Sequence, residues 1–435
     1  MEPGDKTEQD NGKKTAGKKI RGLKDLILSV LGLVAMNGVL QLFLYPTINN
    51  TLGEERYGDI LSMLAVVSVL AASIGTGANY ARMVAENKGR GANGDFNVFL
   101  LASVVPVSVV ATVTLVLENK GLVFNILFLV LAVVSVVRYY GDVEFRLNVN
   151  YFRFFLYYVL ISVGYVGGTF LIKYRVFGDD VSWVTAVIAG ETLAVGFVAV
   201  TGGIFKGKDA LRLSPEAKAN FKTTMFLLAT NLINALALQA DKLLLRIFMN
   251  GEAVTVFYLA TLVGKIVAML TTPLNGVIIG YLNRYKGKFT KKLFGAATMT
   301  AIGVIVVFTA LGVLASHIFI KWKYPGSYET ASAFFLLGNA GQIFYFIASS
   351  MMVFVLRFVH ERFQLIINSV YAVVFIGTLI PMVYFFGIAG LTWGLLAVNA
   401  LRFFAVVIIG FAHTEKKDGG PGIEDGGSEK PSAAD

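Results

Sequence analysis

The sequence contains no cysteine and few charged residues. Without cysteine, the chain has no disulfide framework, no thiolate nucleophile and no cysteine-ligated metal site. Charged residues make up 15% of the chain and hydrophobic residues 56%, whereas a soluble globular protein has about 25% charged residues. The mean hydropathy is +0.68. This balance excludes a soluble globular protein and indicates a protein built from membrane spans.

Enzyme motifs are also scarce. The three histidines, His317, His360 and His413, are scattered, and no GxxxxGK[ST] phosphate-binding loop occurs. We therefore expect neither an enzyme nor an ATPase, and no cofactor or metal site. Coupling of transport to H⁺ or Na⁺ stays open.

The apolar residues fall into twelve blocks of about 20 residues, the length that crosses a bilayer as a helix. The blocks are 25–46, 57–81, 96–117, 122–137, 154–172, 182–204, 223–245, 254–282, 293–320, 330–356, 363–386 and 389–412. Strands of a membrane barrel would be shorter and would alternate apolar with polar residues. The sequence thus predicts an all-α polytopic membrane protein with twelve transmembrane helices.

Lysine and arginine predict the orientation. Of these residues, 28 lie in the two tails and the even-numbered connections, and seven lie in the odd-numbered connections. Because basic residues concentrate on the cytoplasmic side, we expect a cell-membrane protein with both termini cytoplasmic. The net charge of +10 is explained by these connections, so we expect no nucleic-acid partner. The first apolar block is a full span, which argues against a cleavable signal.

The longest basic connection divides the chain into two halves of six spans. Three residues of the first half recur at an offset of 198. They are Gln41 with Gln239, Gly53 with Gly251, and Glu54 with Glu252. A same-direction repeat of this kind implies a central site between the halves. The predicted domains are a basic tail (1–24), an N-lobe (25–204), a cytoplasmic linker (205–222), a C-lobe (223–412) and a disordered tail (413–435).

Two stretches resemble a known family. "NNTLGEERYGDILSMLAVVSVLAASIGTGANYARMV" (49–84) has Tyr57-Gly58, a small-residue run and a final Arg82. It resembles the first outside loop and second helix of polysaccharide-type, Wzx-like lipid-linked oligosaccharide flippases. These belong to the multidrug/oligosaccharidyl-lipid/polysaccharide exporter superfamily. The stretch 239–285 repeats the scheme with an Asp near the end of the seventh helix, a short loop and Tyr258.

The resemblance implies both a fold and a function. The fold would be MATE-like, with two six-helix lobes around a central cleft lined mainly by helices 1, 2, 7 and 8. The function would be to flip an undecaprenyl-diphosphate-linked oligosaccharide to the outer leaflet by alternating access, for capsule or exopolysaccharide biosynthesis. Membrane lipids, a polysaccharide polymerase and glycosyltransferases would be the other partners.

Cations and amides in the predicted cleft helices are candidates for substrate binding. Lys265 lies about 17 Å into helix 8, near the midplane of a core about 30 Å thick. It would pair with the substrate diphosphate, or it would snorkel to the interface or pair with an acid of another helix. Arg82, at the inner end of helix 2, would contact the head group or serve as an ordinary positive-inside residue. The amides are Asn37, Gln41, Asn234 and Gln239. They suit sugar hydroxyls and helix–helix hydrogen bonds equally.

Three further residues are candidates for gating or coupling. Asp241, about 27 Å along helix 7, would close the outer side or form an interfacial ion pair with Lys242. Glu191 would couple transport to a proton or sodium ion, or pair within its lobe. Pro273 would act as a hinge or as a static kink.

Other functions stay open beside the flippase. A cation-coupled multidrug exporter of the same fold usually carries a carboxylate in helix 1, where this chain has Asn37 and Gln41. A polysaccharide polymerase or ligase commonly needs a large outer loop, and the outer loops here are short. A membrane scaffold without transport is the third alternative.

Overall fold

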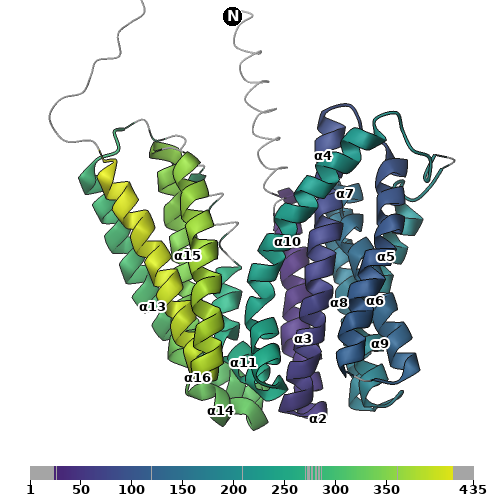
Figure 1. The fold of residues 1–435 in the computed structure, drawn as a ribbon, viewed down its shortest axis with the longest axis horizontal. Helices are drawn as coiled ribbons and strands as arrows, with labels where there is room; N and C mark the ends of the chain where they lie inside the picture. Colours follow the sequence, from purple (N-terminus) through teal and green to yellow (C-terminus); the bar gives the residue numbers. More distant parts are fainter. Residues whose placement is uncertain are drawn as a thin grey trace, which may run out of the picture. The chain divides into compact units, whose positions relative to one another are not determined.

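The structure is a computed structural model that describes residues 24–414 with short gaps (Figure 1). The positions outside the description are 1–23, 26, 119, 208, 270, 272–274, 276–277, 280–281, 283–284, 286, 360 and 415–435. Most of both predicted tails and the predicted hinge Pro273 therefore lie outside the described residues. The described elements are all helices.

The first two membrane helices meet at a glycine. The first runs over Ile27–Leu52 and ends in the π-helical turn η1 (Leu40–Leu44) and α2 (Tyr45–Leu52). The second is a continuous rod of α3 (Glu54–Leu70), the π-helical segment η2 (Ala71–Thr76) and α4 (Gly77–Asn87). Gly53 joins them with φ 88°, a backbone conformation that glycine adopts without a steric penalty.

The remaining helices follow with short connections. They are α5 (Asn93–Glu118), α6 (Leu122–Gly141), α7 (Val143–Leu147), α8 (Tyr151–Lys173), α9 (Asp179–Thr201), α10 (Ala217–Phe248), α11 (Gly251–Ala268), α13 (Lys291–Lys323), η3 (Pro325–Ser327), α14 (Tyr328–Ser332), α15 (Phe335–Phe358) and α16 (Glu361–Ala412). Within the described residues, eleven helices are long and apolar enough to cross a membrane. The all-helical polytopic prediction is therefore confirmed.

The last two of the twelve predicted spans meet inside one assigned element. The predicted spans 363–386 and 389–412 lie in one element, α16, which has a non-helical Gly387 with φ 57° and ψ −136° inside it. The predicted connection is thus a sharp break rather than a loop. The prediction also placed the start of helix 7 near Thr223, whereas α10 begins at Ala217. Its first turns contain the exposed Lys218 and Lys222 and the buried Asn220, so hydropathy misses them.

The chain divides into two compact units. Unit 1 comprises residues 1–260, 315–335 and 380–391, and unit 2 comprises residues 261–314, 336–379 and 392–435. Unit 1 therefore contains α10 and the first half of α11 as well as the six helices of the predicted N-lobe. This division by contact differs from the predicted boundaries at 204 and 223, and the lobes themselves remain a proposal.

The α3–η2–α4 rod is the central helix of unit 1. Its most apolar window is 72% buried, because α6 and α10 approach it along the predicted small-residue run. A Cβ on Gly75 would lie 2.4 Å from the carbonyl oxygen of Val136 in α6. A Cβ on Gly77 would lie 3.0 Å from the Cα of Leu228 in α10. The small residues thus allow backbone-level packing of membrane helices.

Unit 2 has an aromatic and aliphatic core of its own. Phe289 stacks on Phe358 with ring centroids 4.7 Å apart, and Phe294 packs edge-on against Phe411 at 5.0 Å. Ile343, fully buried on α15, belongs to the same cluster. This core joins the helices of unit 2 and positions the polar residues discussed below.

Candidate functional site

Two candidate amides of the first membrane helix have different partners. The Asn37 Nδ2 donates to the Leu33 carbonyl oxygen at 2.8 Å, one turn earlier in the same helix. Gln41 instead accepts a hydrogen bond of 2.6 Å from the hydroxyl of Tyr258 in α11. Gln41 therefore connects the first membrane helix to α11, and Asn37 is bonded locally.

Four tyrosine rings pack together at the end of unit 1 that holds Gly53, which we call the Gly53 end. The tyrosine cluster consists of Tyr45, Tyr57, Tyr258 and Tyr324, with ring centroids 5.9–6.1 Å apart. Burial raises the pKa of the Tyr324 phenol, so this side chain stays neutral. Each aromatic pair contributes about 0.5–1.5 kcal/mol beyond burial. The cluster thus stabilises the contact between the first two membrane helices, α11 and the end of α13.

Beside the tyrosine cluster, two glycines bring the backbones of α3 and α11 into contact. A Cβ on Gly58 would lie 1.6 Å from the carbonyl oxygen of Gly251. A Cβ on Gly251 would lie 2.1 Å from the carbonyl oxygen of Glu55. The Thr255 hydroxyl donates to the Glu54 carbonyl oxygen at 2.7 Å. This glycine crossing joins the two short loops that the offset of 198 relates.

The candidate residues of α10 lie next to this contact. Asp241 is buried, with 9% of its surface exposed, and its Oδ1 accepts a 2.9 Å hydrogen bond from the backbone N–H of Lys242. The Lys242 ammonium donates to Gln239 Oε1 and lies 5.8 Å from the centroid of the Tyr258 ring. Asn234 is exposed. Gln239 and Gln41 are therefore both near Tyr258, whereas Asn234 is not part of this group.

Lys265 belongs to unit 2 and is half-buried on α11. The residue before it, Gly264, donates its backbone N–H to the Asn339 Oδ1 at 2.7 Å. A Cβ on Gly264 would lie 2.8 Å from the Cβ of Gln342, so α11 and α15 pack closely beside the lysine. The start of α11, at Gly251, is about 21 Å away along the helix axis.

Arg82 has protein partners within unit 1. Its Nη1 forms an ion pair of 2.5 Å with the Glu86 carboxylate one turn later. Its Nη2 donates to the Asn93 Oδ1 at 3.0 Å, and its guanidinium lies 5.8 Å from the Phe96 ring centroid. Only 7% of the residue is exposed. Arg82 therefore connects α4 to the start of α5.

Glu191 lies in a buried ion pair that sequence patterns only partly predict. Arg138 donates through Nε to Glu191 Oε2 at 2.6 Å and through Nη2 to Oε1 at 2.9 Å. The Tyr165 hydroxyl adds a third hydrogen bond, at 3.0 Å. Arg138 directly follows the predicted span 122–137, but it is buried within α6, which continues to Gly141. Hydropathy ends a span at its first charge, and the structure shows that the helix continues.

The predicted linker is anchored to unit 1 through an acid that the sequence analysis did not select. Asp95, at the start of α5, is fully buried. It accepts hydrogen bonds from the Ser214 backbone N–H at 2.7 Å, the Ser214 hydroxyl at 2.6 Å and the Asn220 Nδ2 at 2.8 Å. These three bonds fix the entry into α10. In the sequence, Asp95 follows Asn93-Gly94 and belongs to no motif, so no local pattern marks it as a buried acid.

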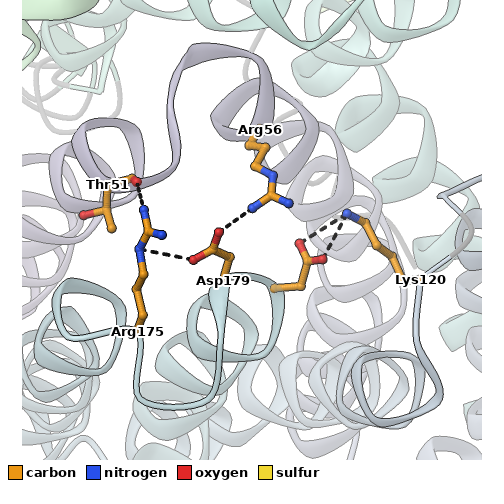
Figure 2. Close-up of polar contacts among 6 residues, drawn as sticks. Thr51, Arg56, Lys120, Arg175 and Asp179 are labelled. Carbon is orange, nitrogen blue, oxygen red and sulfur yellow. Dashed lines mark hydrogen bonds and ion pairs between the residues drawn. The ribbon is translucent and has the colours of Figure 1, made fainter.

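A second set of ion pairs connects loops at the Gly53 end. Figure 2 shows Asp179 between Arg56 at 2.6 Å and Arg175 at 3.3 Å, while Arg175 also donates to the Thr51 carbonyl oxygen at 3.0 Å. Lys120 pairs with the neighbouring Asp180 at 3.2 Å. Both acids occupy the first turn of α9, where the helix dipole stabilises negative charge. In the described part of the chain, no group of three or more His, Asp or Glu side chains could hold a metal ion.

The chain matches no protein-family profile and no curated protein sequence. Solved structures are similar in fold. An inward-facing multidrug resistance MATE family transporter of the MOP superfamily is 17% identical, with a TM-score of 0.59 over 88% of this chain and 93% of that chain. The lipid II flippase MurJ, in an inward closed conformation, is 13% identical, with a TM-score of 0.65 over 89% of this chain and 87% of that chain.

A third solved structure, the Vibrio cholerae MATE transporter VcmN, is 14% identical and has a TM-score of 0.54 over 91% of this chain and 97% of that chain. At these identities the similarity concerns the fold alone. The chain therefore has the fold shared by MATE transporters and MurJ, which confirms the MATE-like fold class at this level.

Proposed function

We propose that the protein flips an undecaprenyl-diphosphate-linked oligosaccharide from the cytoplasmic to the outer leaflet by alternating access, for surface polysaccharide biosynthesis. The observation that supports this most is the contact at the Gly53 end. An alternating-access transporter needs one side closed by contacts that can separate again. The glycine crossing, where Gly58 of α3 meets Gly251 of α11, meets this need. Its two backbones touch without interlocking side chains, so the helices can separate without rearranging side chains.

Uncharged groups form much of this contact, which favours reversible opening. The tyrosine cluster joins the first two membrane helices to α11, and Asn49 Nδ2 donates to Ser327 Oγ at 3.1 Å. One ion pair, Arg246 with Asp59 at 3.3 Å, lies at its rim. In the proposed orientation, with both termini cytoplasmic, this end is the outer side. Asp241, Gln239 and Gln41 are then gate contacts of the closed state.

A flippase fits the intramembrane charges better than a cation-coupled exporter does. The first membrane helix, Ile27–Leu52, has no Asp or Glu. Glu191 is bound by the Arg138 guanidinium and the Tyr165 hydroxyl, which occupy three of the about four acceptor positions of its carboxylate. The cation Lys265 suits an anionic substrate. We assign Lys265 to the substrate diphosphate, Asn37 and Asn234 to the glycan path, and Arg82 to positioning the inner end of α4.

The proposed architecture places an N-lobe (25–204) and a C-lobe (223–412) around the substrate path, connected by the linker (205–222). The Asp95 anchor keeps the linker with the N-lobe, so the lobes would move relative to each other about the start of α10. Glycosyltransferases would supply the lipid-linked repeat unit and a polymerase would consume it.

Gene deletion and complementation test the proposal. We expect loss of the surface polymer and intracellular accumulation of the lipid-linked repeat unit. Lys265→Ala should abolish complementation, and Lys265→Arg should restore much of it because the charge is kept. A normal surface polymer in the deletion strain would refute the flippase function. The shared fold keeps the exporter as second candidate, and efflux of a cationic dye that depends on an ion gradient would support it instead.

A further inference from the structure

The stretch from Ala253 to Thr414 is almost free of acids. Residues 253–414 contain eleven Lys and Arg residues but only two acids, Glu329 and Glu361. Glu329 lies in α14, before α15, and Glu361 begins α16. None of the five apolar blocks predicted between 254 and 412 contains an Asp or Glu. A cation inside these spans therefore has no carboxylate of the same spans to pair with.

Arg402, in the second part of α16, is such a cation. Its Nη1 donates to the Ser349 hydroxyl and its Nη2 to the Asn368 Oδ1, each at 3.2 Å. Both acceptors are neutral. The guanidinium also lies over the rings of Tyr345 and Tyr371, 4.9 and 4.8 Å from their centroids. We call these five side chains the Arg402 cluster.

Two features of the Arg402 cluster indicate unused binding capacity. The Nε of Arg402 is buried, and within the described residues it has no hydrogen-bond partner; the same holds for the hydroxyl of Ser350 beside Ser349. The cluster is also held in place, because the Tyr371 hydroxyl donates to Asn399 Oδ1 at 2.9 Å and Asn399 Nδ2 donates to the Gly341 carbonyl oxygen at 3.0 Å. A fixed, half-buried guanidinium that has only neutral acceptors among the described residues is suited to bind an anion.

The comparison with unit 1 shows what a completed pair looks like. There, Arg138 also lies within the spans, but the Glu191 carboxylate binds it with two hydrogen bonds and only 8% of the arginine is exposed. Arg402 is more open, and all five members of its cluster are half-buried. In unit 1 the Glu191 carboxylate is the anion that binds the arginine, whereas the Arg402 cluster as defined contains no carboxylate.

The surroundings indicate which kind of anion fits. Exposed apolar side chains flank the cluster on α16: Val370 next to Tyr371 is 56% exposed, and Leu401 next to Arg402 is 59% exposed. A small hydrated anion gains nothing from such a surface, whereas a lipid contributes an apolar chain beside its charged group. We propose that the Arg402 cluster binds a phosphate group carried on a lipid. That the lipid includes the transported diphosphate rests on the proposed function.

Binding by the full-length protein tests this inference. Native mass spectrometry of the detergent-solubilised protein would measure its affinity for undecaprenyl diphosphate and, separately, for phosphatidylglycerol. Because hydrogen bonds to charged groups contribute about 1.5–3 kcal/mol, we expect Arg402→Gln to bind at least one of these lipids about tenfold more weakly or worse. Arg402→Lys, which keeps the charge without the planar fork, should fall between Arg402→Gln and the wild type.

Arg357→Gln is the matched control, because it removes the same charge at the end of α15, outside the cluster. It should bind both lipids within about twofold of the wild type. Thermal unfolding of each variant would show that it is folded, and Arg402→Lys serves if Arg402→Gln is not. A loss confined to undecaprenyl diphosphate assigns the site to substrate, and a loss for phosphatidylglycerol assigns it to a membrane lipid.

The inference is overturned if the wild type binds neither lipid, or if Arg402→Gln binds both as tightly as the wild type does. The flippase proposal fails separately, through a normal surface polymer in the deletion strain. That result would leave the lipid-binding measurement unaffected.

Discussion

The glycine crossing predicts that one added methyl group opens the Gly53 end. In Gly58→Ala, the new Cβ would lie 1.6 Å from the Gly251 carbonyl oxygen. An ordinary contact at this distance range needs about 3.5 Å, so the two backbones must separate by about 2 Å. The nearest atom is a backbone oxygen of α11, so the clash cannot be relieved by a rotamer change of a side chain. Overpacking of this kind costs about 1–3 kcal/mol.

If the closed contact bears this cost and the open state does not, the equilibrium shifts about 5- to 150-fold towards opening. The absence of native cysteine makes the shift measurable with one reporter. Thr255→Cys places a thiol at a fully buried position of the contact. In the Gly58→Ala background, a membrane-impermeant thiol reagent added outside should label this cysteine faster by that factor.

Two further variants make the experiment specific. Gly251→Ala should act in the same direction, because its Cβ would lie 2.1 Å from the Glu55 carbonyl oxygen. Gly38→Ala is the control, since nothing lies within 4 Å of its added Cβ, and it should label at the parent rate. If Gly58→Ala is folded and also labels at the parent rate, the glycine crossing is not a gate contact.

Three other predictions concern stability. Glu191→Gln leaves the buried Arg138 without a counter-charge and should destabilise the protein by about 3–5 kcal/mol in detergent unfolding, and pairing it with Arg138→Met should recover much of this loss. Asp95→Asn weakens three hydrogen bonds to the connection before α10, so limited proteolysis should cut within 205–222 faster; an unchanged cleavage rate would contradict the anchor. Arg56→Gln removes a partly exposed ion pair at the Gly53 end and should change the unfolding free energy by less than about 1 kcal/mol, which a larger shift would disprove.

The sequence was most informative where hydropathy alone decides the structure. A span must bury or present apolar residues over the full bilayer thickness and satisfy its backbone internally, so its existence is encoded locally. Its ends are not, because a helix continues as long as its polar side chains find partners. The span ends at Arg138 and at Ala217, where α10 begins, were misplaced for this reason, whereas the predicted connection at 387–388 coincides with the break at Gly387.

The candidate site divides in the same way. The sequence by itself determined a polytopic helical protein, a chain without cysteine, the offset of 198 and the scarcity of acids in residues 253–414. Only the tertiary structure decided which residues meet: Gln41 with Tyr258, Glu191 with Arg138, Gly58 with Gly251, and Arg402 with acceptors that are all neutral among the described residues. These contacts join helices far apart in the chain, so a partner's identity depends on how the helices pack and not on any local pattern.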